Sequence, residues 1–199
     1  MPELRALRSV YEPLAQSVRR LIDVSIRSEA DARTVKSAMD KIDSAAAELG
    51  TSLHEGSFGL QHSSDGQAMV WGNVVIGLRN PAAPPLTVHH EADGTVWAEF
   101  TLGAAYEGPP GHVHGGVCAM ILDHVLGATA HKPGRPAFTG TLSVRYLRGT
   151  PLGRPLRAQA RIERVEGAKT FAAGHISDDE GVTVQAEGIF IHRRDDARR

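Results

Sequence analysis

An acidic residue interrupts an otherwise apolar segment, and this is where the sequence is best suited to chemistry. Residues 117–130 read VCAMILDHVLGATA, with Asp123 in the middle. A helix that is apolar all round is normally buried, and aspartate is rarely buried without a partner, because an unpaired carboxylate there costs several kcal/mol. Asp123 therefore marks a candidate site, in which the carboxylate would act as a base.

The tripeptide His114-Gly115-Gly116 comes just before this segment and can open a helix. The first N–H groups of a helix have no partner within the helix, and the helix dipole adds partial positive charge there. Glycine also lets a substrate approach the backbone closely. The N–H groups of Gly115 and Gly116 are therefore candidate donors to an oxyanion.

The spacing of these two features predicts an oligomer. Gly115 and Asp123 are eight positions apart, or about 12 Å along one helix. One reacting carbon cannot lie within about 3 Å of groups at both points. The N–H of one subunit must then meet the carboxylate of another, which predicts a homodimer with two equivalent composite sites. A dimer of dimers, a homotetramer, stays equally open.

The elements that must position these residues follow from periodicity. Residues 1–50 predict a helical extension: Ser28 to Asp31 resemble a capping box, an apolar stripe with helical spacing follows, and Gly50 ends it. This extension is expected to pack on the main domain or a partner subunit, with a regulatory or docking arm as the alternative. Residues 51–67 predict a loop, 68–192 the main domain, and 193–199 a charged tail.

The main domain alternates apolar and polar residues with a period of two. Three strands are expected before the apolar helix: one marked by apolar residues between 70 and 78, then 86–90 and 96–102, with a hairpin turn at Asp93-Gly94. Four strands follow the helix, and the first places Thr139 on one face with Thr141 and Ser143. A single antiparallel sheet wrapped around one central helix, an α+β fold, accounts for this order.

Composition excludes several classes of protein. Lys and Arg number 22 against 23 acidic residues, which argues against a nucleic-acid partner. No apolar run approaches the ~20 residues of a membrane span, and the N-terminus lacks the apolar core of a secretion signal. The sequence therefore predicts a cytoplasmic protein. A single cysteine, Cys118, excludes an intramolecular disulfide and a cysteine-based zinc site.

Together these motifs resemble hotdog-fold acyl-CoA thioesterases of the phenylacetate-pathway and hydroxybenzoyl-CoA thioesterase type. The similarity covers residues 65–192, through GPPGHVHGGVCAMILDHVLG, FTGTLSVRYLRGTPLG, RIERVEGAKTF and VQAEGIFI. It is closest to members that carry Asp on the helix and Thr on the next strand. The resemblance implies a hotdog fold and the hydrolysis of an acyl-CoA to a free acid and coenzyme A, with no metal or other cofactor.

The resemblance also implies a role for each motif residue. The Gly115 N–H polarises the thioester carbonyl, with Gly116 as a second donor. Asp123 is the general base or the nucleophile, Thr139 orients the attacking water, and His114 is a positioning residue. Relatives often have an Asn or Gln upstream that also contacts the carbonyl, whereas residues 107–112 here supply no amide side chain.

Other residues allow further interpretations. Cationic side chains are needed near the phosphates of coenzyme A, and the candidates are Arg145, Arg148 and Lys169. A metal site at His112, His114 and His124 is disfavoured, because the spacing is irregular and no carboxylate is expected to support it. Cys118 is expected to be a buried, inert thiol rather than a nucleophile. Asp123 as a loop-capping carboxylate and Thr139 on an ordinary polar face are the structural alternatives.

Two other functions compete with the thioesterase. A non-catalytic hotdog module could bind acyl-CoA or a partner protein, since fold does not fix function. A retained Asp123–Thr139 pair argues against this, because a pure binder has no use for a buried acid. A hotdog dehydratase or hydratase usually brings an Asp and a His together in a different motif, which this sequence lacks.

Overall fold

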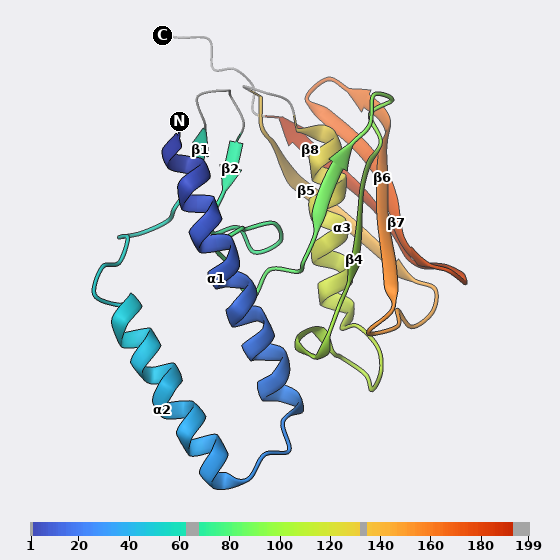
Figure 1. Ribbon diagram of the computed structural model, residues 1–199. Coiled ribbons are helices and arrows are strands. Elements are labelled where there is room, and N and C mark those ends of the chain that lie inside the picture. The colour runs from blue at the N-terminus through green and yellow to red at the C-terminus, as the bar shows by residue number, and fades with distance from the viewer. Residues whose placement is uncertain (1, 63–67, 132–134, 193–199) are drawn as a thin grey trace. The chain divides into compact units, whose positions relative to one another are not determined.

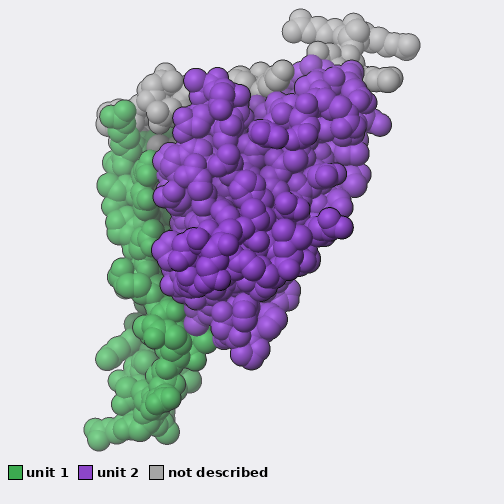
Figure 2. Space-filling view, turned by 90° about the vertical axis from the view of Figure 1, so that its right-hand side faces the viewer, with its two compact units in different colours: residues 1–82 green, residues 83–199 purple. Residues whose placement is uncertain are grey.

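The computed structural model describes residues 2–62, 68–131 and 135–192. The chain divides into two compact units, residues 1–82 and 83–199, shown in different colours in Figure 2. The six-stranded sheet begins inside the second unit, at Thr87. The predicted domain boundaries remain predictions, and the predicted tail at 193–199 lies outside the described residues, as do residues 63–67 of the predicted loop.

The first unit contains two helices and a small sheet. Helix α1 spans Pro2–Arg27 and α2 spans Ala32–Leu49. The cap of α2 is Asp31, whose side chain accepts the Thr34 N–H at 2.7 Å. The helix therefore begins one turn later than a capping box at Ser28 predicts. Strands β1 (Leu60–His62) and β2 (Ala68–Val70) pair antiparallel.

The expected strand through residues 70–78 is wrong beyond Val70. The Asn73 side-chain oxygen accepts the N–H groups of Val75 and Ile76 at 2.8 and 3.0 Å, and the Gly77 N–H donates to the Asn73 carbonyl at 3.0 Å. An asparagine that binds its own backbone in this way competes with a strand ladder. Residues 71–78 fold mainly as turns, although their apolar residues alternate as they would in a strand.

The second unit is the predicted α+β fold. Its antiparallel sheet has the order β3-β4-β6-β7-β8-β5, and α3 runs along one face of it (Figure 1). The elements are β3 Thr87–His90, β4 Val96–Thr101, α3 Gly115–Ala130, β5 Ala137–Tyr146, β6 Pro155–Glu166, β7 Lys169–Asp178 and β8 Gly181–His192, with a short 3-10 helix at Ala104–Tyr106. Two strands of this sheet precede the helix and four follow, so the hotdog arrangement is confirmed.

Helix α3 lies close to the sheet because glycine stands where the two meet. A side chain at Gly174 or Gly188 would approach Leu126 of α3 to 2.9 and 3.2 Å, and one at Gly127 would come within 3.2 Å of the Phe190 ring. One face of α3, including Leu126, is buried against the strands, whereas Met120 and Asp123 are only partly buried. This close packing accounts for the apolar residues on the buried face and fixes the position of the helix over β7 and β8.

Within the described part of the chain, no helix is long and apolar enough to cross a membrane.

Candidate active site

The N-terminus of α3 presents one backbone donor. His114 caps the helix, and its Nδ1 accepts the Gly116 N–H at 3.0 Å. A neutral His114 therefore carries its proton on Nε2. The Gly116 N–H is thus engaged and does not serve as the second donor expected for it, whereas no acceptor among the described residues takes the Gly115 N–H. Gly115 remains as the free donor at the positive end of the helix dipole.

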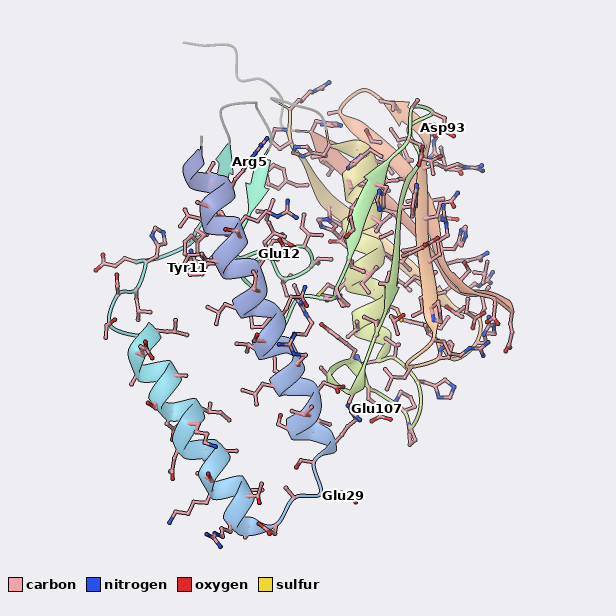
Figure 3. The ribbon with its side chains drawn as sticks, in the orientation of Figure 1. Arg5, Tyr11, Glu12, Glu29, Asp93 and Glu107 are labelled. Atoms are coloured by element: carbon pink, nitrogen blue, oxygen red, sulfur yellow. The ribbon has the colours of Figure 1, made fainter. Side chains whose placement is uncertain are left out.

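The loop before α3 fixes His114 in this position. Residues Glu107 and Val113 form a β-bridge, and the His114 N–H donates to the Tyr106 carbonyl at 2.9 Å. Gly108 lies so close that a Cβ there would be 2.7 Å from the His114 Cα. Glu107, labelled in Figure 3, accepts the Gly111 N–H at 2.9 Å, so its carboxylate is used within the loop. The positioning of the helix start is therefore built from local backbone contacts.

Tyr146, at the end of β5, is a site residue that the sequence analysis did not single out. Its hydroxyl donates to the Gly115 carbonyl at 2.8 Å, and its ring lies 3.2 Å from where a Gly115 Cβ would stand. Alternation along β5 puts Tyr146 on the same face as Leu142 and Val144, which pack against the core beneath α3. The sequence signal for Tyr146 was therefore a polar hydroxyl at the end of a row of otherwise apolar β5 side chains. The structure thus adds a contact that orients the first peptide of the helix.

Asp123 and Thr139 meet, although by a route that the sequence did not predict. The Thr139 hydroxyl donates to Oδ1 of Asp123 at 2.8 Å. Thr139 pairs with Phe190, which is buried under α3, whereas Thr141 pairs with Ile189. The register shifts at Gly140 by one residue, and such a bulge changes the face on which neighbouring side chains lie. The expected common face for Thr139, Thr141 and Ser143 is therefore wrong.

Gly115 and Asp123 lie on the same uninterrupted helix. Their spacing of about 12 Å at 1.5 Å per residue therefore holds in the folded chain. Within one subunit, the free N–H and the Asp123–Thr139 pair are too far apart to act on one carbon.

The histidines do not gather around a metal. Among the described residues, no three His, Cys, Asp or Glu side chains lie close enough to hold a metal ion. His112 packs on Gly149, where a Cβ would come within 2.7 Å of its Nε2, and its Nδ1 contacts the Pro110 carbonyl at 2.9 Å. His124 is next to Asp123, and burial lowers its pKa, against a smaller opposing effect of that carboxylate. A neutral His124 is therefore favoured.

Cys118 is buried inside the core, and burial raises the pKa of its thiol. Its only hydrogen-bond partner among the described residues is the Thr150 hydroxyl, at 3.7 Å from Sγ. A protonated thiol in this position is a poor nucleophile. Cys118 therefore packs the core, as expected.

The three cationic candidates for coenzyme A binding do not form one cluster. Arg145 pairs with Gln185 on β8, whereas Lys169 pairs with Ile191. Six residues of β8 separate these levels, or about 20 Å at 3.4 Å per residue. In one subunit, Arg145 and Lys169 cannot therefore contact the same phosphate.

Arg148 is already occupied. It forms a two-pronged ion pair with Asp178, with Nη1–Oδ2 at 3.0 Å, and donates to the Gly181 carbonyl at 2.8 Å. Hydrogen bonding from Arg148 is the largest influence that holds the pKa of Asp178 at about 2, below its ordinary value of 3.8. Arg148 therefore joins β5 to the β7–β8 turn, and this correction removes it from the phosphate-binding candidates.

Arg148→Met is expected to lower the melting temperature by a few degrees at neutral pH. Because the folded-state pKa of Asp178 is depressed, the stabilisation is complete above about pH 4 and is lost as the pH falls through about 2. Thermal unfolding from pH 7 to 2 should therefore show the two proteins converging in acid. Arg154→Met, which removes exposed pairs with Asp179 and Glu180, is the control and should change little. A difference that persists unchanged at pH 2 would contradict the assignment.

Comparisons with known proteins agree with this geometry. A family model described as the thioesterase superfamily matches residues 110–185, which include the start of α3, Asp123 and Thr139. Acyl-coenzyme A thioesterase THEM4 of Xenopus laevis is 32% identical over 105 residues, which are 52% of this chain and 47% of that protein. Human acyl-coenzyme A thioesterase THEM5 is 29% identical over 94 residues. The chain spans about half the length of the curated relatives it matches.

Similar solved structures extend the match to nearly the whole chain. A crystal structure of a thioesterase superfamily protein is 33% identical, with a TM-score of 0.80, and the match covers 92% of this chain and 95% of that one. A phenylacetic acid degradation-related putative thioesterase from Ralstonia eutropha shares the fold at 23% identity and a TM-score of 0.50, over 53% of this chain and 83% of that one. The chain belongs to the hotdog-fold thioesterase superfamily.

Proposed function

We propose that the protein is an acyl-CoA thioesterase, which hydrolyses an acyl-CoA thioester to a free acid and coenzyme A. The observation that carries the proposal is the hydrogen bond from Thr139 to Asp123 on an apolar helix whose start offers a Gly115 N–H without an acceptor among the described residues. The thioesterase superfamily model matches residues 110–185, which contain both features, and curated relatives are named as acyl-coenzyme A thioesterases.

The reaction needs an activated water and a polarised carbonyl. In the proposed mechanism Asp123 accepts a proton as water attacks the thioester carbon, and Thr139 holds the carboxylate or the water in place. The Gly115 N–H donates to the oxyanion that forms. The C–S bond then breaks, the carbonyl re-forms, and the thiolate of coenzyme A takes up a proton. Attack by Asp123 itself would instead give an acyl anhydride that water then hydrolyses.

The two halves of the site come from different subunits in this proposal. The 12 Å that separate Gly115 from Asp123 along α3 require it, at about 1.5 Å per residue. A two-fold homodimer supplies two equivalent composite sites, each with Gly115 of one chain and Asp123 of the other. Arg145 and Lys169, about 20 Å apart along the sheet of one subunit, are proposed to contact coenzyme A phosphates at different points. A dimer of such dimers and a cytoplasmic location remain predictions.

Mixing two inactive variants tests the composite site. Asp123→Asn removes the base from one half, and Gly115→Pro removes the donor from the other. Random re-pairing after mild dissociation gives half heterodimers, each with one intact site of two, so the 1:1 mixture should recover about a quarter of wild-type activity. Each variant re-paired with itself is the control. A mixture no more active than its components would show that both groups act within one subunit.

Thr139 is expected to act through Asp123. Thr139→Val keeps the shape of the side chain and removes the hydroxyl, and it should lower kcat by about tenfold or more, the scale of one lost charge-assisted hydrogen bond. Thr139→Ser keeps the hydroxyl and should retain most activity. Rescue by Thr139→Ser separates positioning from folding, because only the hydroxyl distinguishes the active variant from the impaired one, and both should melt near the wild-type temperature. An unchanged rate in Thr139→Val would remove Thr139 from the mechanism.

Thiol release from a panel of short, long and aryl acyl-CoAs tests the activity itself. Wild-type turnover of at least one thioester supports the proposal and reports the acyl preference. Binding of acyl-CoA without thiol release from any member would overturn it in favour of a binding module.

A further inference from the structure

Helix α2 carries an apolar seam whose side chains are exposed. None of its residues is buried, and the exposed fractions of its large apolar side chains are 44% for Val35, 54% for Met39, 39% for Ile42 and 52% for Leu49. Glu29, labelled in Figure 3, lies in the short connection between α1 and α2. Most of the stability of a helix this short comes from packing its apolar face. The seam therefore calls for a partner.

The seam has the spacing of a two-stranded coiled coil. Its apolar positions recur at alternating steps of three and four residues, at Ala32, Val35, Met39, Ile42, Ala46 and Leu49. This is a heptad repeat in which Ala32, Met39 and Ala46 hold the first core position and the other three hold the second. The heptad spacing fits another helix as the partner, and Ala38 and Ala45 extend the apolar stripe along one flank of the seam.

The sizes of these residues fit a second copy of α2 that runs antiparallel. In that arrangement a residue at the first core position lies beside one at the second. Ala32 then lies beside Leu49 of the second copy, and Met39 beside its Ile42. Val35 lies beside its Ala46. Both outer layers join a larger side chain to alanine, which keeps the two helices evenly spaced along the contact.

The charges beside the seam are complementary between two copies of α2. Lys36 and Asp43 occupy equivalent flanking positions of successive heptads, and Ala38 and Ala45 occupy the opposite flank. An antiparallel pair places Lys36 beside Asp43 of the second copy, and the two-fold axis repeats the ion pair. A parallel pair would instead place Asp43 beside Ala38 and Lys36 beside Asp31, the residue that caps α2. The charges therefore fit a second copy in either orientation, and the sizes of the core residues select the antiparallel one.

We propose that α2 pairs with α2 of a second copy of this chain, antiparallel about a two-fold axis. The surface is the seam with its Lys36–Asp43 flank, and the occupant is the same surface of the other copy. The argument uses only α2 and is independent of the proposed reaction. Because two helices of 18 residues are short for an independent coiled coil, the test uses the full chain.

Paired cysteines test the register directly. In the antiparallel pair Val35 of one chain lies beside Ala46 of the other. The double variant Val35→Cys/Ala46→Cys therefore brings together two thiols from different chains. Within one chain they are about 16 Å apart at 1.5 Å per residue, too far for a disulfide. Mild oxidation at low protein concentration should convert most of the chain to a covalent dimer, read on a non-reducing gel. The native Cys118 is buried and is present in every variant, so wild type sets the background.

Three matched controls define the outcome. Val35→Cys and Ala46→Cys alone should stay monomeric on the gel, because each residue lies far from its own copy in an antiparallel pair. Ser37→Cys/Ser44→Cys, at the same height on the opposite face of α2, should also fail to cross-link. Covalent dimers from the single variants would show a parallel pair and overturn the proposal. No dimer from Val35→Cys/Ala46→Cys, the result if α1 or another protein covers the seam, would also overturn it.

Charge reversal gives a second test in the same cysteine background. Lys36→Glu places two carboxylates together twice per pair and should slow cross-linking by roughly two- to fivefold. Adding Asp43→Lys restores opposite charges and should restore the rate. A double reversal no faster than Lys36→Glu alone would contradict the register. None of these readouts depends on catalysis, so their failure is distinguishable from failure of the thioesterase proposal.

Discussion

Asp123→Asn is expected to lower kcat for thioester hydrolysis by about 10²- to 10⁴-fold, the range associated with loss of a general base or acid. The amide has nearly the same shape, and its oxygen can still accept the Thr139 hydroxyl, which contacts Oδ1 at 2.8 Å in the native protein. It cannot take a proton from water or attack the thioester. The substitution therefore removes the reactive group and leaves its surroundings in place. Thiol release under saturating acyl-CoA measures the effect.

Two controls separate chemistry from folding. Asp93→Asn, at the β3–β4 turn labelled in Figure 3, changes a carboxylate that accepts the Thr95 N–H at 2.9 Å, and it should leave kcat unchanged. The melting temperature of Asp123→Asn should stay within a few degrees of wild type, because burying a neutral amide is less unfavourable than burying a charge. A folded Asp123→Asn protein with the wild-type rate would make Asp123 a structural carboxylate.

Gly115→Pro is expected to lower kcat by about 10²- to 10³-fold, the usual loss when one oxyanion donor is removed. Proline has no N–H, and it is well tolerated at the first position of a helix. His114 is extended, with φ −60° and ψ 132°, a conformation compatible with a following proline. The helix should therefore form normally without its donor. Steady-state thiol release measures kcat and KM separately.

Gly115→Ala is the matched control for this variant. Both substitutions add a Cβ about 3.2 Å from the Tyr146 ring, so both require Tyr146 to shift by a few tenths of an ångström. Only proline also removes the N–H. We expect Gly115→Ala to lose far less activity than Gly115→Pro, and equal losses in the two would show that crowding at Tyr146, rather than the donor, is responsible.

The sequence predicted most elements because their patterns are local. The alternation of Val96, Ala98 and Phe100 gives β4, whose inward side chains are buried, and the apolar run around Asp123 gives α3. The same reasoning failed at residues 71–78, because the pattern is compatible with a strand but the Asn73 side chain satisfies the backbone locally. Periodicity reports which residues are apolar and does not report which hydrogen bonds the backbone makes.

The sequence by itself determined the fold class and located the two candidate groups, because a carboxylate in an apolar helix and a His-Gly-Gly turn are visible without coordinates. Only the tertiary structure decided which side chains these groups meet. A one-residue shift at Gly140 turns Thr139 towards Asp123, and Arg148 is taken up by Asp178, thirty positions away. Strand register and contacts between distant residues arise from packing the whole sheet against α3, and no local pattern encodes them.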